Sequence, residues 1–597
     1  MNGKQRLELN WIGKYEKPRL EPRILIEDTE QSYHASEKAD GDRFDNILVH
    51  GDNLLALKAL EAEYRGQVKC VYVDPPYNTG NAFEHYDDGV EHSIWLSLIR
   101  DRLELLRSLL APDGFLCCQI DDTEGAYLKV MLDEIFGRSN YLTSFYIQVR
   151  YGNKTLAEDS DFQKVIEQCF IYAKDANVGK PIKGSEEYKV EKFEWEIQER
   201  APGKGVELGG KRVEIFKPGE YEVTKVVPHL KALKETWATG SLLKQKGSSG
   251  EFLGKYLAPR KSEDGLGCLY KVYGIGEDGI GHRYFTGPKK EKATKGKFYS
   301  GIPLDRLAEL QRGQSKKEKP IENFYDLAAN FGNCRLEGGA DFRSGKKPER
   351  LLEIVLKHFS REGDLVLDSF AGSGTTGAVA HKMGRRWIMV ELGDHAKTLI
   401  VPRLKSVIDG TDNTGVTDEI GWKGGGGFRF YRLAPSLLDK DKWGNWVISK
   451  DYNSAMLAEA MCKHMGFTYA PSQNIAEYWR HGHSSEHDFI FVTTASLTHD
   501  QLKAISLDVG SDRTLLICCK AFNARPEDFN NLTVKKIPHA VLSRCEWGRD
   551  DYSLEIASLP IVEREADAEG DAAPRNGTKA TRKGNGDQPT LFGDGEG

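Results

Sequence analysis

Four consecutive residues have the types and spacing needed to grip an exocyclic amine. Asp74, Pro75, Pro76 and Tyr77 directly follow the apolar segment 70–73, which is expected to be a buried strand. An amine conjugated to an aromatic ring is a poor nucleophile, because the ring shares its lone pair. A carboxylate (Asp74) and a backbone carbonyl (Pro75) that each accept one N–H localise that lone pair. The prolines fix the turn, and Tyr77 offers a flat face for a planar base, so we expect all four residues to be catalytic.

A second group of residues, from Leu365 to Thr376, has the pattern of a nucleotide-binding turn. It reads LVLDSFAGSGTT, an apolar strand followed by a glycine turn and the start of a helix. Glycines let backbone amides approach a ligand, and a helix start offers unpaired N–H groups to an anion. An acid ends the next strand, where it can accept from ribose hydroxyls. The residues expected to bind a nucleoside cofactor on these grounds are Asp368, Gly372, Ser373, Gly374, Thr375 and Glu391.

The elements around both groups alternate between strand and helix. We expect strands at 46–50, 70–73 and 115–120, with helices at 54–64 and 95–110, where apolar residues recur every three or four positions. The same rhythm returns with a helix at 348–359, a strand at 365–368, a helix at 375–383 and a strand at 387–390. This predicts an α/β fold with a mostly parallel sheet covered by helices on both faces.

The 597 residues are too many for one hydrophobic core. We expect an N-terminal arm (1–30), a catalytic half (31–174), an insertion (175–340), a cofactor-binding half (341–410), a C-terminal α/β domain (411–562) and a disordered tail (563–597). No apolar run could cross a bilayer and no secretory signal is visible, which predicts a cytoplasmic protein. The ten cysteines show no metal-binding spacing and are expected to be reduced and buried, so no metal is predicted.

The net charge of −7 is unevenly distributed along the chain, because the insertion is basic. Residues 211–319 contain about 23 Lys and Arg against about 13 Asp and Glu, an excess that can meet phosphates. The segment 282–301 interleaves aromatic and basic residues, in which lysines can contact phosphates while an arginine or an aromatic ring reads or wedges bases. A solvated lysine-rich loop is the alternative. The residues expected to bind DNA are Arg283, Lys289, Lys290, Lys295 and Lys297.

The two motifs and their order resemble the DNA amino-methyltransferases that use S-adenosyl-L-methionine, in particular the N6-adenine group in which DPPY precedes FxGxG. The resemblance implies a circularly permuted Rossmann-like methyltransferase fold with an inserted target-recognition domain. It also implies that Asp52 lies near the adenine ring of the cofactor, that Phe370 is the aromatic residue of the glycine motif, and that Lys347 begins the KPxxLL segment beside the cofactor.

Residues 47–140 are further similar to the modification subunits of Type III restriction-modification systems, through HGDNLLALKAL, VDPPYNTGN and LLAPDGFLCCQIDD. That resemblance implies double-stranded DNA as substrate, a homodimer and a separate helicase-nuclease subunit, since this chain has no GxxxxGK[ST] phosphate loop. One departure is Ile166-Glu167, where the family often has a His-Glu pair. The tail segment Gln588–Phe592 resembles peptides that dock on the bacterial sliding clamp.

Several alternatives remain open from the sequence. Cytosine-N4 methylation uses the same amine chemistry, although such enzymes more often have Ser at position 74. A solitary adenine methylase would need no restriction subunit. Protein glutamine methylation is disfavoured by the motif order, and a DNA-binding specificity subunit with a silent fold is disfavoured by the intact Asp74, Tyr77 and Gly372.

Overall fold

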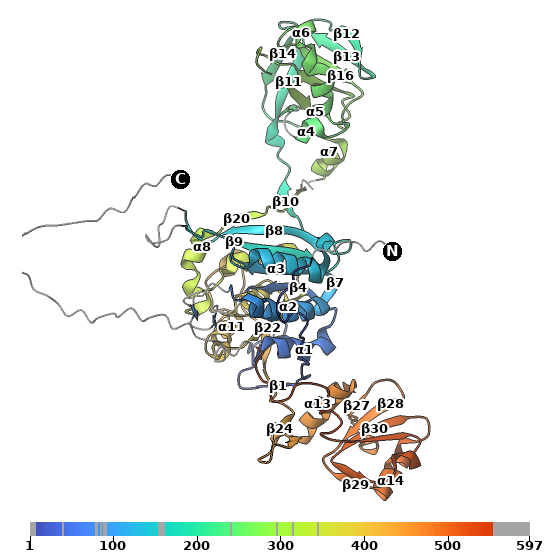
Figure 1. Cartoon of the computed structure of the whole chain (residues 1–597). Coiled ribbons are helices and arrows are strands. Elements are labelled where there is room, and N and C mark those ends of the chain that lie inside the picture. The colour runs from blue at the N-terminus through green and yellow to red at the C-terminus, as the bar shows by residue number, and fades with distance from the viewer. Residues whose placement is uncertain are drawn as a thin grey trace, which may run out of the picture. The chain divides into compact units, whose positions relative to one another are not determined.

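The computed structural model describes residues 8–38, 41–77, 82–83, 86–87, 92–152, 162–238, 241–293, 296–312, 316–342 and 345–552 (Figure 1). Residues 553–597, with the predicted tail and the segment Gln588–Phe592, lie outside the described residues, as does Lys295. Within the described ranges, no helix combines the length and the apolar character that crossing a membrane requires.

The central sheet contains the parallel strands that the sequence predicts. Its middle part has the order β3-β22-β21-β4-β7, and all four of these pairings are parallel. The bounds are β3 (Asn46–His50), β4 (Val68–Val73), β7 (Leu110–Ile120), β21 (Leu365–Asp368) and β22 (Arg386–Glu391). The carboxyl ends of β4, which leads into Asp74, and β21, which ends at Asp368, are therefore neighbours.

Helices cover both faces of this sheet. On one face, the helices α1 (Asn53–Tyr64), α2 (His92–Leu109) and α3 (Gly125–Leu132) share a core with the strands. On the other face lie α9 (Glu349–Phe359), α10 (Thr375–Lys382) and α11 (Val401–Ile408). Pro348 is the N-cap of α9 in an extended conformation, one residue before the helix itself.

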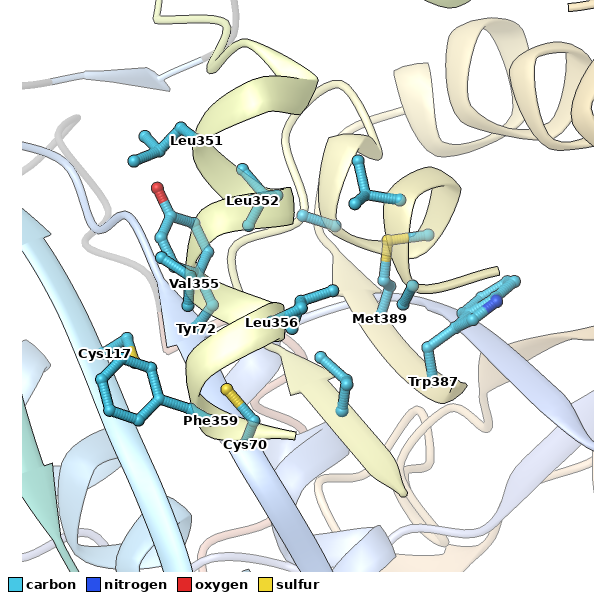
Figure 2. Close-up of a cluster of buried hydrophobic side chains, with 14 of the residues drawn as sticks. Cys70, Tyr72, Cys117, Leu351, Leu352, Val355, Leu356, Phe359, Trp387 and Met389 are labelled. Carbon is cyan, nitrogen blue, oxygen red and sulfur yellow. The ribbon is translucent and has the colours of Figure 1, made fainter. Parts of the chain in front are cut away.

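The packing of α9 shows how the apolar pattern positions the site. Five of its buried apolar side chains have the spacing of one helix face: Leu351, Leu352, Val355, Leu356 and Phe359. Figure 2 shows these side chains beside Cys70 and Tyr72 of β4 and Cys117 of β7. Because α9 is fixed on the sheet in this way, the residues just before it are fixed beside the end of β4.

Strand β7 begins five residues earlier than its apolar run predicts. The turn-forming residues 112–114 lie inside the strand, because the pairing with β4 shifts there: Val68 pairs with Leu110, and the next pair joins Cys70 to Phe115. The extra residues of β7 are accommodated as an irregularity in the ladder. Gly114 is required at this place, since a Cβ atom would lie 2.7 Å from the Val68 carbonyl oxygen.

Further strands extend the central sheet at both edges. Beyond β7 come β9 (Ile166–Ala173), β8 (Tyr141–Gln148) and β20 (Phe324–Asp326). Beyond β3 come β23 (Gly427–Leu433) and β1 (Leu25–Glu27). Strand β23 falls within the residues expected to form the C-terminal domain, and β1 within the expected N-terminal arm. By strand pairing, both belong to the central sheet.

The insertion has its own antiparallel sheet of eight strands, in the order β12-β13-β16-β17-β18-β15-β11-β14. The bounds are β11 (Phe193–Glu199), β12 (Lys204–Leu208), β13 (Lys211–Phe216), β14 (Tyr221–Lys225), β15 (Leu233–Trp237), β16 (Leu269–Tyr273), β17 (His282–Thr286) and β18 (Lys297–Ser300). Before and after it, β10 (Gly184–Glu187) and β19 (Lys316–Lys319) pair antiparallel, so the two connecting segments run together.

A smaller α/β unit follows β23. Its sheet has the order β26-β27-β28-β30-β32. The short strands β26 (Thr468–Tyr469) and β27 (Gly482–His483) lie at one edge, and β28 (Asp488–Val492), β30 (Thr514–Cys519) and β32 (Leu532–Lys536) are parallel. Helices α13 (Ser454–Met465) and α14 (His499–Val509) accompany it. All ten cysteines are buried free thiols, which confirms their predicted burial.

Candidate active site

The DPPY segment leaves the sheet at the carboxyl end of β4, as predicted. Asp74 follows Val73 directly, and its side chain is 17% exposed. The buried indole of Trp95, on α2, donates a hydrogen bond from Nε1 to the Pro76 carbonyl at 2.7 Å. The turn is therefore held by a helix of the catalytic half as well as by its two prolines.

The Tyr77 hydroxyl and the Lys347 ammonium group join Asp74 to a second carboxylate. The hydroxyl lies 2.6 Å from Asp74 Oδ1 and 3.0 Å from Glu167 Oε2. Lys347 Nζ donates to the Tyr77 hydroxyl oxygen at 2.7 Å, and it lies 3.3 Å from Asp74 Oδ2 and 3.0 Å from Glu167 Oε2. These four side chains come from the end of β4, from β9 and from the segment before α9, and they form one polar cluster.

The ionisation of the cluster follows from burial and from the shared lysine. Burial raises the pKa of Asp74 to about 6, since it outweighs the attraction of Lys347, while Glu167 pushes the pKa up as well. Burial also acts against the charge of Glu167, but Lys347, Gln119 and Tyr77 together outweigh it and lower its pKa. The two carboxylates in turn overcome the burial of Lys347 and raise its pKa. At neutral pH, the cluster therefore holds two carboxylates and one ammonium group.

The glycine motif is tightly bonded to the acids that flank it. Asp368 Oδ1 accepts from the Phe370 amide at 2.9 Å, and its Oδ2 accepts from the Thr376 hydroxyl at 2.5 Å. Burial raises the pKa of Asp368 to about 7. Glu391 accepts from the Gly372 amide through Oε2, at 2.7 Å. Gly372 and Gly374 have φ values of 53° and 75°, the left-handed region in which glycine costs least.

Helix α10 starts at this turn without a side-chain cap. Thr375 Oγ1, at its first position, donates to the Lys347 main-chain carbonyl at 3.1 Å and lies 3.1 Å from Ser373 Oγ. Arg403 of α11 donates to the Ser373 carbonyl at 3.0 Å. Lys347 thus links the two predicted groups, with its side chain in the DPPY cluster and its main chain on the glycine motif.

Asp52 lies at the start of α1 and is 1% exposed. Its Oδ1 caps the helix by accepting from the Leu55 amide at 2.9 Å. Its Oδ2 accepts from Arg102 at 3.2 Å and from the Tyr552 amide at 3.1 Å. The carboxylate is therefore already held by an ion pair and by a residue near the end of the described chain.

Comparison with known proteins decides the family. A family model described as DNA methylase matches residues 68–402, more than half of the chain. The chain belongs to this family of DNA methylases. A Type III restriction-modification enzyme Mod subunit of Haemophilus influenzae, HindVI, named as probable, is 32% identical over 424 residues, covering 66% of this chain and 55% of its own length. The EcoPI Mod subunit of Escherichia phage P1 is 28% identical over 426 residues, covering 63% and 61% respectively.

The matched region thus spans little more than half the length of these curated relatives. The solved structure of the PvuII DNA methyltransferase (cytosine-N4-specific) aligns with 64% of this chain and 93% of that chain, at 12% identity and a TM-score of 0.29. The expected Rossmann-like fold is confirmed by the mostly parallel central sheet of this DNA methylase, with helices on both faces.

The basic residues expected to bind DNA differ in their surroundings within the insertion of the methylase. Lys289 and Lys290 are exposed. Arg283 donates to Ser249 Oγ at 2.5 Å and lies 3.7 Å from Asp278 Oδ2, while Lys297 is paired with Glu235 at 2.6 Å. Lys289 and Lys290 are thus the ones among these four that present an unshielded charge to solvent.

The aromatic side chains of the same segment are mostly structural. Phe285, Phe298 and Tyr299 are 0%, 7% and 3% exposed. The Tyr284 hydroxyl donates to Glu199 Oε1 at 2.5 Å. Reading or wedging of bases by Arg283 or by an aromatic ring stays a prediction, and the three buried rings pack inside the insertion. Phe285 and Phe298 share the core of the insertion. Tyr299, the strand neighbour of Phe298, faces the opposite side of the sheet, where its hydroxyl donates to Glu235 Oε2 at 2.7 Å.

Sequence reasoning missed several residues of the site. In the sequence, Glu167 stands out only as a departure from the family pattern, and no local pattern connects Gln119 or Trp95 with Asp74. The contact between Gln119 and Glu167 depends on strand pairing. Gln119 of β7 pairs with Cys169 of β9, so it lies on the same sheet face as Glu167. Its side-chain amide donates to Glu167 Oε2. Among the residues that the structure describes, no group of three or more His, Cys, Asp or Glu could hold a metal ion.

Proposed function

We propose that the chain is a site-specific DNA methyltransferase that transfers a methyl group from S-adenosyl-L-methionine to N6 of adenine in double-stranded DNA. The observation that carries this proposal is the meeting of the DPPY carboxylate with the glycine motif through Lys347, in a chain of the DNA methylase family. The aspartate at position 74 supports adenine over cytosine.

In this mechanism, Asp74 and the Pro75 carbonyl each accept one N–H of the adenine amine, which directs its lone pair towards the electrophile. The ring of Tyr77 stacks on the extruded base. Lys347 keeps Asp74 in the carboxylate form that can accept an N–H, since it lies 3.3 Å from Oδ2. The proton released from the methylated amine passes to Asp74 or to solvent.

The glycine motif fits the cofactor. Bound S-adenosyl-L-methionine supplies an electrophilic methyl group on its sulfonium. The uncapped start of α10 offers N–H donors for its carboxylate. The Ser369 hydroxyl beside the turn is buried and, among the described residues, has no hydrogen-bond partner, so a polar ligand group can satisfy it. The residues that would hold the cofactor are Asp52, Lys347, Asp368, Phe370, Gly372, Ser373, Gly374, Thr375 and Glu391.

The relatives named as Type III Mod subunits support a proposal for the biological role and the partners of the protein. We propose that the protein acts in the cytoplasm as the homodimeric modification subunit of a restriction-modification system, beside a separate helicase-nuclease polypeptide. Lys289 and Lys290, with Arg283, Lys295 and Lys297, contact the DNA. The segment Gln588–Phe592 is a candidate contact to the sliding clamp.

Methylation-sensitive sequencing of host DNA tests the proposed function. Cells expressing the wild type should carry N6-methyladenine at one recurring sequence, and cells expressing Asp74→Ala should lack that mark. The same data would reveal the recognition sequence. A mark on cytosine, or an unchanged adenine pattern with Asp74→Ala, would falsify the assignment.

A further inference from the structure

Lys347 is shared between two carboxylates rather than paired with the DPPY aspartate alone. Its Nζ lies 3.3 Å from Asp74 Oδ2 and 3.0 Å from Glu167 Oε2. The side chains of Lys347, Asp74 and Glu167 are 8%, 17% and 16% exposed. Solvent screens charges at such sites weakly, so each charge acts strongly on its neighbours.

Glu167 is fixed in this position by its own neighbours. The Gln119 side-chain amide donates to Glu167 Oε2, and the Tyr72 hydroxyl, on β4, donates to Gln119 Oε1 at 2.7 Å. Glu167 therefore connects β9, β7 and β4 with the Tyr77 hydroxyl, which lies 3.0 Å from its Oε2. A carboxylate that only supported the fold would not need to approach both Tyr77 and Lys347.

We propose that Glu167 and Lys347 are positioning residues that act on Asp74 in opposite senses. Lys347 favours the carboxylate form of Asp74, which accepts an amine N–H. Glu167 competes for the same ammonium group and adds a second negative charge, which favours the protonated form. Glu167 also orients Lys347 and the Tyr77 hydroxyl. This inference rests on the proposed methyl transfer and assigns a role to a residue outside the DPPY and glycine motifs.

Burial is the largest influence on Asp74 and raises its pKa to about 6, with Lys347 lowering the pKa and Glu167 raising it. The further titratable groups that interact with Asp74 are Tyr72, Tyr77, Cys118, Cys169 and Asp368. Burial raises the pKa of each of these five groups, so the thiols and phenols stay neutral near pH 6. The carboxyl group of Asp368 also titrates near this range, because burial raises its pKa to about 7. Substitution of Lys347 or Glu167 leaves Asp368 itself in place.

The signs of the expected effects are opposite for the two residues. Asp74 is active as a carboxylate, so activity falls as the pH drops through its pKa. Glu167→Gln removes the negative charge, so Lys347 then interacts with Asp74 as its one carboxylate partner in the cluster. This lowers the pKa of Asp74 and moves the acid limb, the low-pH side of the pH–activity profile, to lower pH. Lys347→Met removes the positive charge and moves the limb to higher pH. Each shift should be on the order of one pH unit.

The test is the pH profile of kcat/KM for DNA, which reports groups of the free enzyme, measured on the full chain between pH 5 and 9. The Lys319–Glu322 ion pair supplies matched controls, since both side chains are at least half exposed. Glu322→Gln and Lys319→Met should leave the acid limb where the wild type has it. Thermal unfolding checks that every variant is folded, and the isosteric Glu167→Gln carries the test if Lys347→Met does not fold.

An acid limb that moves down for Glu167→Gln supports the inference, and so does one that moves up for Lys347→Met. A folded, active Glu167→Gln enzyme whose limb is unchanged or moves up overturns it. This outcome is distinguishable from failure of the proposed function. If the proposed function failed, the wild type would transfer no methyl group to DNA at any pH.

Discussion

Tyr77 contributes two separate parts of its side chain to the site. Its hydroxyl lies 2.6 Å from Asp74 Oδ1 and accepts from Lys347 at 2.7 Å, while its ring has Lys347 Nζ at 4.8 Å from the centroid. In the proposed mechanism, the ring also stacks on the extruded adenine. The two contributions can be separated by substitution, because phenylalanine keeps the ring and removes only the hydroxyl.

We expect Tyr77→Phe to lower kcat by roughly tenfold through the lost hydrogen bond to a charged group, with base extrusion retained. Tyr77→Ala should also lose stacking, at about 1–3 kcal/mol. Fluorescence of 2-aminopurine at the target position measures extrusion, and single-turnover methyl transfer measures the chemistry. If Tyr77→Phe lost the extrusion signal as fully as Tyr77→Ala, the division between ring and hydroxyl would be refuted.

At the scale of elements, buried charges join the helices that hold the glycine turn. Glu349 of α9 accepts from Arg403 of α11 at 2.8 Å and from Lys382 of α10 at 2.7 Å, and Lys382 also pairs with Asp412 at 2.6 Å. All four side chains are at most 1% exposed. Arg403 in turn donates to the Ser373 carbonyl, so this network fixes the backbone that would receive the cofactor.

Glu349→Gln should therefore lower the free energy of unfolding by about 3–5 kcal/mol, because it leaves the buried Arg403 without the carboxylate that it pairs with. Its control is Glu419→Gln, which breaks an exposed pair with Arg350 and should cost no more than about 1 kcal/mol. Urea denaturation followed by circular dichroism measures both. Equal stability of the two variants would contradict the importance of the buried network.

Apolar periodicity and turn residues in the sequence predict the helices and strands of the core. The position of β23 and the role of Glu167 depend instead on pairing between segments that are distant in the sequence. Helix α9 and strands β3, β4 and β21 follow from apolar periodicity and flanking turn residues. The place of β23 beside β3 could not be read from its own residues, since the glycines at 424–427 suggest only a hinge. Glu167 was missed for the same reason, because its site partners are brought to it by β7 and by the segment before α9.

In the whole molecule, the central sheet carries the proposed chemistry and the insertion carries the proposed phosphate contacts. Lys289→Ala combined with Lys290→Ala should weaken DNA binding and reduce the salt dependence of affinity by about two phosphate contacts, with little change in kcat. Lys297→Ala should change the slope less, because Lys297 is already paired with Glu235. Fluorescence anisotropy across a salt series measures the slopes, and the idea fails if the double variant keeps the wild-type slope.

The chemical identity of the product tests the proposed methyl transfer to adenine N6. Purified protein, S-adenosyl-L-methionine carrying a deuterated methyl group and double-stranded DNA are incubated, and the digested nucleosides are identified by mass spectrometry. We expect labelled N6-methyldeoxyadenosine with the wild type, and a loss of that label on the order of 100-fold or more with Asp74→Ala. Labelled N4-methyldeoxycytidine, or equal labelling of adenine by both proteins, would contradict this expectation.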